Sequence, residues 1–251
     1  EGHICVEVYD GGIESSGHPY DFSPDPLVLN RCTEYVSTDP AVIRPFILVE
    51  GKLYLHRYFN YESQLINKIN LLLQQDPDEF TERMNLLQNH LPRLKDIMVY
   101  HSDVDMLPEE ERPDWQFAAS VLAFLYPFSI ITGGPGTGKT TTVAKILALL
   151  YETNPSINVA MAAPTAKAAD RMLESLNSTT LPLQPAILQW FKSLESKTIH
   201  RLLGARPDSI YFLHHSSNPL PFDVVIIDEA SMIDMPQFSK LVQAVKPGTR
   251  L

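Results

Sequence analysis

The 251-residue sequence has only two cysteines, Cys5 and Cys32, which are too few for a disulfide framework and favour a reducing, cytoplasmic environment. It also lacks a long hydrophobic run, because its longest apolar stretch, residues 117–132, falls short of the roughly 20 residues that a membrane span needs. The N-terminus has neither an initiator Met nor a basic region followed by an apolar one, so we expect no signal peptide and a start within a longer protein. Hydrophobic residues at 44% and charged residues at 20% exclude a disordered chain and predict a globular protein.

Charge is distributed unevenly along the chain. Residues 1–113 carry 9 basic and 20 acidic side chains, a net charge of −11, whereas residues 114–251 carry 11 basic and 10 acidic ones, a net charge of +1. Nonspecific affinity for nucleic acid comes mainly from Lys and Arg that neutralise phosphates, so phosphate chemistry is expected after residue 113. The run Glu109–Pro113 is typical of an exposed connector. We therefore predict one domain over residues 1–112 and another over residues 113–251.

The first domain is predicted to be a smaller mixed α+β unit. Phe46–His56 places two β-rich runs around a central Gly51, which is typical of a hairpin. The apolar spacing in Tyr61–Gln75 predicts an amphipathic helix, and another helix is expected over Asp78–Leu91. The histidines of this part lack ligand spacing, so we expect no metal site among them: His3, His18, His56, His90 and His101.

Strand-like and helical runs alternate in the second domain. Strands are expected over residues 128–132, 158–162 and 224–228, and helices over residues 139–152, 165–177 and 237–245. This alternation predicts an α/β fold in which helices flank a parallel sheet. Ligands of such sheets lie at the carboxyl ends of the strands.

The strongest motif follows the first of these strands. Residues 133–140, Gly-Gly-Pro-Gly-Thr-Gly-Lys-Thr, match the phosphate-binding loop GxxxxGK[ST], whose glycines let backbone N–H groups close around an anion at a helix N-terminus. We predict that Lys139 reaches the β- and γ-phosphates of a nucleoside triphosphate and that the Thr140 hydroxyl ligates Mg²⁺. The predicted nucleotide-binding residues of the loop are Gly133, Gly134, Pro135, Gly136, Thr137, Gly138, Lys139, Thr140 and Thr141.

A pair of carboxylates, Asp228 and Glu229, ends a later apolar strand. Asp228 is predicted to hold Mg²⁺ through water, and Glu229 to orient and deprotonate the attacking water. A strand end without a ligand is the alternative, and the position of the pair 89 residues after Lys139 in an alternating array favours the metal. The two motifs indicate use of a nucleoside triphosphate, which kinases, GTPases, transporters and DNA motors share.

The residues around these motifs resemble superfamily one DNA helicases, most closely the motor subunits of RecBCD-type helicase–nuclease complexes. The similar segments are residues 1–5, 48–57, 133–145, 163–169, 198–204 and 228–234, with Gln116 ahead of the loop. The resemblance implies an ATP-driven DNA helicase that moves 5′ to 3′ on single-stranded DNA and whose first RecA-like motor domain occupies residues 113–251. It also implies that residues 1–112 dock the other subunits of the complex, and it implies no membrane partner.

The resemblance further implies roles for single residues. Gln116 would read adenine, because an amide both donates and accepts at one base edge, although a solvated helix residue is the alternative. Lys167 and Arg171 lie one turn apart on a polar helix face, where either a phosphate contact or plain solvation is expected. Ala166 stands where the family has a glycine. The implied DNA contacts are Pro164, Thr165, Lys167, Thr198 and His200.

The nucleotide motifs are also compatible with two functions other than that of a helicase. A nucleotide-binding but non-hydrolysing assembly module is the first, and a small-metabolite kinase, for which no acceptor pocket is evident, is the second. Helicases of this type bind ATP between two RecA-like domains, and arginines from the far domain are worth about 10³ to 10⁵ in rate in related enzymes. Because the sequence ends 22 residues after Glu229, we expect the sheet to be incomplete and the chain alone to hydrolyse ATP slowly.

Overall fold

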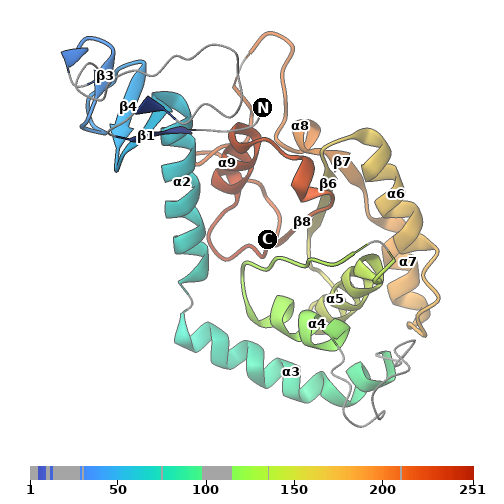
Figure 1. Ribbon diagram of the computed structural model, residues 1–251. Coiled ribbons are helices and arrows are strands. Elements are labelled where there is room, and N and C mark those ends of the chain that lie inside the picture. The colour runs from blue at the N-terminus through green and yellow to red at the C-terminus, as the bar shows by residue number, and fades with distance from the viewer. Residues whose placement is uncertain are drawn as a thin grey trace. The chain divides into compact units, whose positions relative to one another are not determined.

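The computed structural model describes residues 5–9, 12–13, 29, 31–74, 76–97, 115–134, 136–209 and 211–251, without the side chains of residues 9, 12, 13 and 91–97 (Figure 1). The chain forms two compact units, which are described separately: residues 1–67 with 234–240, and residues 68–233 with 241–251. The predicted connector Glu109–Pro113 lies outside the described residues. The predicted division into residues 1–112 and 113–251 therefore stays a prediction.

The first unit is built on a five-stranded sheet in the order β2-β1-β5-β4-β3. Its strands are β1 (Cys5–Tyr9), β2 (Gly12–Ile13), β3 (Val36–Ser37), β4 (Phe46–Val49) and β5 (Lys52–Leu55). The predicted hairpin is confirmed, since β4 and β5 pair antiparallel. Glu50 and Gly51 form its two-residue loop with φ angles of 49° and 74°, the positive values that a type I′ turn requires at both positions.

The two faces of this sheet differ. Ile47 and Tyr54 are buried on one face, where the Tyr54 ring meets Phe59 of helix α2 (His56–Leu73) with 5.4 Å between ring centroids. Burial, with the neighbouring Glu62 carboxylate and Cys5 adding to it, raises the pKa of Tyr54 to about 12. The opposite face has exposed apolar side chains, which the strand register places together: Val6, Phe46 and Leu55.

Helix α2 was predicted over Tyr61–Gln75 but begins earlier, at His56. The backbone passes directly from β5 into the helix, and the His56 N–H donates to the Pro45 carbonyl 3.0 Å away. The buried His56 ring also contacts the segment between β3 and β4, with its Nε2 3.5 Å from the Pro40 carbonyl oxygen. These contacts lie outside the apolar periodicity, which is why the pattern alone placed the start too late.

The second unit contains a parallel sheet in the order β7-β6-β8, formed by β6 (Val159–Ala163), β7 (Ser196–Thr198) and β8 (Val224–Ile227). All five residues of the central strand β6 are buried, as expected for a strand covered by helices on both faces. The predicted α/β fold with a parallel sheet is therefore confirmed. Helix α6 (Ala166–Asn177) follows β6, as predicted.

The strand predicted over residues 128–132 is wrong as a regular strand, because the described residues 126–134 form neither strand nor helix. Leu251 N–H donates to the Pro127 carbonyl and the Leu251 carbonyl accepts from Ser129 N–H, a parallel pairing pattern around Phe128. Arg250 in turn forms a parallel bridge with Val224. The backbone hydrogen bonds described for this segment join it to Leu251, and one such bridge does not make a regular strand.

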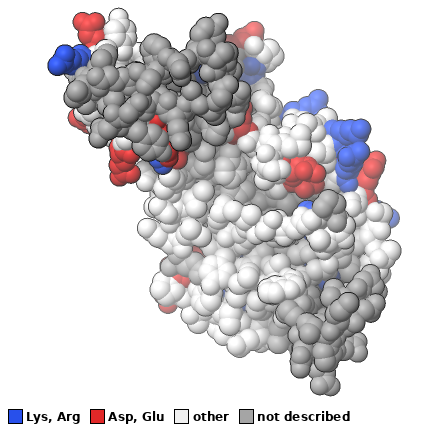
Figure 2. Space-filling model, in the orientation of Figure 1, with Lys and Arg blue, Asp and Glu red and all other residues white. Residues whose placement is uncertain are grey.

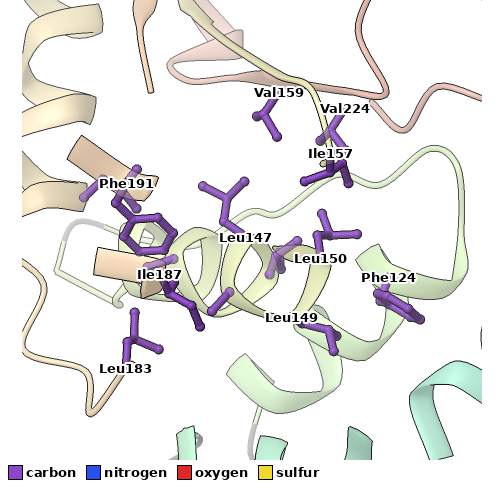
Figure 3. Close-up of a cluster of buried hydrophobic side chains, with 14 of the residues drawn as sticks. Phe124, Leu147, Leu149, Leu150, Ile157, Val159, Leu183, Ile187, Phe191 and Val224 are labelled. Carbon is purple, nitrogen blue, oxygen red and sulfur yellow. The ribbon is translucent and has the colours of Figure 1, made fainter. Parts of the chain in front are cut away.

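Helix α5 (Lys139–Thr153) is the centre of the second unit and packs against α3, α4 and α6. Every residue from Ala144 to Leu150 is buried, and Figure 3 shows Leu147, Leu149 and Leu150 projecting from this helix into the core. The other helices are α3 (Pro77–Ile97), α4 (Trp115–Leu125), α7 (Pro185–Ser193), α8 (Ile199–Leu202), the 3-10 turn η2 (Ala230–Met232) and α9 (Met235–Ala244). Within the described ranges, no helix combines the length and hydropathy needed to cross a membrane.

Candidate functional site

The glycine-rich loop folds back on itself before α5. The Thr137 hydroxyl donates to the Gly134 carbonyl at 2.9 Å, and a Cβ added to Gly133 would lie 2.6 Å from the Thr137 Oγ1. Gly136 and Gly138 have φ angles of +76° and +79°, in the region that L residues with a side chain rarely adopt. Pro135 lies outside the described residues. The loop conformation therefore depends on glycine at several of the predicted positions.

The start of α5 suits an anion. Its N-cap is Gly138, which has no side chain to accept from the first N–H groups of the helix. The Lys139 ammonium donates to the loop carbonyls of Gly133 at 2.8 Å and Gly134 at 2.9 Å, so its charge lies directly over the loop. Thr140 and Thr141 are half-buried in the first turn. Open N–H donors and a cation at one place fit a phosphate group.

The structure brings Gln116 of α4 to this loop. Its amide nitrogen lies 3.5 Å from the Thr137 carbonyl oxygen, and a Cβ added to Gly138 would lie only 2.5 Å from that nitrogen. The Gln116 amide oxygen accepts a 2.9 Å hydrogen bond from the ammonium of Lys145, a residue of α5 that is 2% exposed. Lys145 is not among the predicted site residues, and a cation within an otherwise apolar stretch is the signal in the sequence that marks it.

The far end of α4 is held by two arginines. Arg83 of α3 donates to the Leu125 carbonyl at 3.0 Å, and Arg250 donates to the Phe124 carbonyl at 3.3 Å. The Arg250 guanidinium also lies over the Phe124 ring, 5.5 Å from its centroid. Burial, with Arg83 nearby, lowers the pKa of Arg250 to about 10. Cations at the C-terminal carbonyls of a helix complement its dipole, so α4 is fixed at both ends.

The carboxyl ends of the three parallel strands form one edge. The register pairs Ala163 with Thr198 and Ala162 with Ile227, so the residues that follow each strand start from the same level. Asp228 N–H donates to the Ala162 carbonyl at 2.9 Å, and an Asp228 carboxylate oxygen accepts from Glu229 N–H at 2.9 Å. In the part of the chain that the structure describes, no hydrogen bond or ion pair joins this pair to Lys139 or Thr140.

Glu229 has a left-handed backbone, with φ 52° and ψ 40°. A residue with a Cβ pays roughly 1–2 kcal/mol for this conformation. Glu229 is also exposed, so packing does not explain the conformation. Such strain concentrates at functional sites, and it draws attention to this carboxylate independently of the motif.

The predicted DNA contacts gather at the same edge. Pro164 is half-buried, and both threonines cap helices: the Thr165 hydroxyl accepts from Ala168 N–H at 3.2 Å, and the Thr198 hydroxyl accepts from Arg201 N–H at 3.3 Å. His200 is exposed, with its ring edge-on to Phe212. Lys and Arg side chains gather over α6, the helix of Lys167 and Arg171, with acidic side chains beside them (Figure 2).

Among the described residues, no group of three or more His, Cys, Asp or Glu side chains could hold a metal ion. Thr140 and Asp228 each offer oxygen atoms of the kind that Mg²⁺ prefers. Sites that bind Mg²⁺ in nucleotide enzymes use one or two protein ligands together with substrate phosphates. The residue types therefore fit Mg²⁺ only as part of a metal–nucleotide complex.

A glycine-rich loop at the start of a buried helix, beside parallel strands of which one ends in paired carboxylates, defines the phosphate-loop class of nucleotide-binding α/β folds. The family model described as an AAA domain matches residues 116–251, more than half of the chain, and the chain belongs to this family.

Curated relatives extend the similarity to the remainder of the chain. The chain is 34% identical over 258 residues to the RecBCD enzyme subunit RecD of Mycolicibacterium smegmatis, with all of the chain and 42% of that protein covered. It is 35% identical to the same subunit of Haemophilus influenzae, with 83% of the chain and 32% of that protein covered. The ATP-dependent RecD2 DNA helicase of Deinococcus radiodurans is 33% identical, with 80% of the chain and 23% of that protein covered.

The chain thus spans about two fifths or less of the length of these relatives. The resemblance to motor subunits of RecBCD-type complexes is confirmed.

Proposed function

We propose that this chain is the nucleotide-binding part of an ATP-dependent DNA helicase, a subunit of a RecBCD-like helicase–nuclease of recombinational repair in the cytoplasm. The observation that carries the proposal is the Gln116 amide set against the phosphate loop, because it places a base-reading group beside a phosphate-binding one. The names of the relatives, a RecBCD subunit and an ATP-dependent DNA helicase, supply the substrate class and the complex.

In this proposal the loop and Lys139 bind the triphosphate of ATP. The Lys139 ammonium exchanges its contacts with the Gly133 and Gly134 carbonyls for β- and γ-phosphate oxygens, which carry full charge and accept more strongly. Thr140 and Asp228 would hold Mg²⁺, which neutralises charge on the phosphates. Glu229 orients the attacking water and takes its proton, and its exposed position leaves it accessible to that water.

Single-stranded DNA is proposed to cross the carboxyl edge of the parallel sheet with 5′ to 3′ translocation, a polarity that rests on the resemblance alone. Of the candidate contacts, Pro164, Thr165 and Lys167 follow β6, Thr198 ends β7 and His200 comes shortly after it. The Thr165 and Thr198 hydroxyls accept from backbone N–H groups of α6 and α8, so in this proposal the two threonines fix the starts of these helices at the edge that DNA crosses.

ATP hydrolysis by the full-length protein, measured with and without single-stranded DNA, tests the proposal. Lys139→Ala is expected to lower the hydrolysis rate by about 10²- to 10³-fold without unfolding the protein, since it removes a donor to the transferred phosphoryl group. Glu229→Gln is expected to keep nucleotide affinity and lose hydrolysis, because the amide preserves shape and removes the base. Lys192→Ala, an exposed lysine on α7, is the matched control. Unchanged turnover in Lys139→Ala would contradict the site, and nucleotide binding without turnover in the unaltered protein would favour the non-hydrolysing assembly module.

The N-terminal part is proposed to dock the other subunits of the complex. Its sheet presents an apolar face of Val6, Phe46 and Leu55, which are 41%, 37% and 41% exposed, and residues 1–113 carry a net charge of −11. Leu55→Glu is expected to weaken copurification with the partner subunits at least tenfold, since it places a charge in an apolar contact. Leu71→Glu, at a leucine of α2 that is 61% exposed, is the matched control. Equal losses in both variants, or salt-sensitive DNA binding by this part, would contradict the proposal.

A further inference from the structure

Lys145 is an unusual residue for its place in the fold. It lies on α5 between Ala144 and Ile146, and all three are buried in the core of the second unit. Of the lysines and arginines whose side chains the structure describes, Lys145 alone is buried. A buried ammonium is costly unless its donors are used, so an apolar residue would be the simpler choice for packing alone.

The contact that Lys145 makes reaches out of the core to the nucleotide site. Its ammonium donates to the Gln116 amide oxygen at 2.9 Å, and the amide nitrogen of the same side chain lies 3.5 Å from the Thr137 carbonyl in the phosphate loop. The main chain at Gln116 is held as well, because the buried Ser120 hydroxyl donates to its carbonyl at 2.7 Å. Gly138 leaves room for the Gln116 side chain, because a Cβ at this position would lie 2.5 Å from the Gln116 amide nitrogen.

The chemistry of the two groups fixes the direction of the amide. A lysine ammonium has three donors and no acceptor, so only the oxygen end of the Gln116 amide can face it. The Gln116 oxygen keeps a second lone pair that can accept another hydrogen bond, and the –NH₂ group of the amide faces the phosphate loop. A glutamine discriminates adenine from guanine only when its oxygen accepts from the adenine amino group and its nitrogen donates to N7, since guanine has an acceptor in place of that amino group.

We propose that Lys145 is a positioning residue that sets the orientation of the Gln116 amide and thereby the preference of the nucleotide site for adenine over guanine. The proposal rests on the adenine-reading role proposed for Gln116 above. It adds the residue that holds the Gln116 amide in the orientation that reads adenine. Because Lys145 is buried, it acts in this proposal through Gln116 and not on the nucleotide directly. Its removal frees the amide to rotate, and a rotated amide offers its donor end to guanine.

The test is the ratio of dissociation constants for Mg-GTP and Mg-ATP, measured by calorimetry on the full-length protein. Lys145→Met is expected to lower this preference for ATP about tenfold, the scale of one good amide–base pair. Lys145→Gln is expected to lower it as well, because an amide both donates and accepts and so fixes neither orientation. Lys145→Arg, which only donates, is expected to retain most of the preference, and Lys192→Met is the control on the surface.

A double-variant cycle separates positioning from support of the fold. Gln116→Ala alone is expected to lose the preference, and Lys145→Met added to it is expected to lower the ratio no further, since both act through one amide. If Lys145→Met and Lys145→Gln weaken ATP and GTP binding equally and leave the ratio unchanged while Gln116→Ala lowers it, the inference is overturned and the reading of the base by Gln116 stands. If Gln116→Ala also leaves the ratio unchanged, the base-reading part of the proposed function fails instead. Should Lys145→Met not fold, Lys145→Gln decides the outcome alone.

Discussion

The two sheets of this protein use similar residues in opposite ways. In the first unit, β4 and β5 alternate between buried residues such as Ile47 and Tyr54 and exposed ones such as Phe46 and Leu55, so one apolar face stays open. In the second unit, every residue of β6 is buried. An antiparallel hairpin needs cover on one side only, whereas a parallel strand is joined to its neighbours by helices that cover both. The open apolar face of the first sheet is suited to contact with another molecule. The covered sheet of the second unit is suited to support the phosphate loop and the residues at the strand ends.

The largest expected difference between the two sheets is in how much a substitution lowers the free energy of unfolding. Met161→Ala, at a residue of β6 that is 1% exposed, should lower the free energy of unfolding by about 2–5 kcal/mol, because it leaves a cavity between covered faces. Leu55→Ala on the open face should cost less than about 1 kcal/mol. Denaturant unfolding followed by circular dichroism measures both. Similar losses would mean that the face with Leu55 is covered.

A smaller effect concerns the covered face of the first sheet at high pH. The pKa of Tyr54 is raised to about 12, so above its ordinary value of about 10 the unfolded chain releases a proton that the folded one keeps. The unfolded state then binds fewer protons, and stability should fall by up to about 1.4 kcal/mol per pH unit between about pH 10 and 12. Tyr54→Phe should remove this part of the slope. An unchanged slope in that variant would show that the hydroxyl is not protected in the folded state.

The smallest expected effect is at the turn between β4 and β5. Glu50 has a φ of 49°, and Asn is the residue preferred before Gly in a type I′ turn, so Glu50→Asn should raise the free energy of unfolding by about 0.5–1 kcal/mol. Glu34→Asn, in a turn with negative φ, is the control and should bring no gain. Thermal melting compares the two variants. A gain in the control alone would contradict the strain assigned to Glu50.

Elements with a strong local pattern were predictable from the sequence. The hairpin predicted from two β-rich runs around Gly51 is confirmed by the antiparallel pairing of β4 and β5, and α5 begins at Lys139 as the motif requires. Helix α6 begins at Ala166 after the N-cap Thr165, one residue later than predicted. In each of these cases the signal lies within about a dozen residues, so periodicity and capping could carry it.

Features that depend on distant partners were not predictable. The strand expected at residues 128–132 has an apolar run, but the hydrogen bonds described for it join it to Leu251, and no local pattern reports that neighbour. Lys145 and Gln116 meet across 29 residues, and Arg250 reaches Phe124 across 126. The left-handed backbone of Glu229 has no sequence signal, because Glu is not a residue that favours it.

That conformation of Glu229 has a consequence for how variants of this protein would be selected. Glycine at this position would relieve roughly 1–2 kcal/mol of backbone strain while deleting the carboxylate proposed to activate water. A screen that rewards heat resistance alone would therefore enrich Glu229→Gly and accumulate robust but inactive molecules. The same screen would also enrich changes at Glu50, with no such loss of function. The two glutamates mark, within one chain, where heat resistance and the proposed activity compete and where they do not.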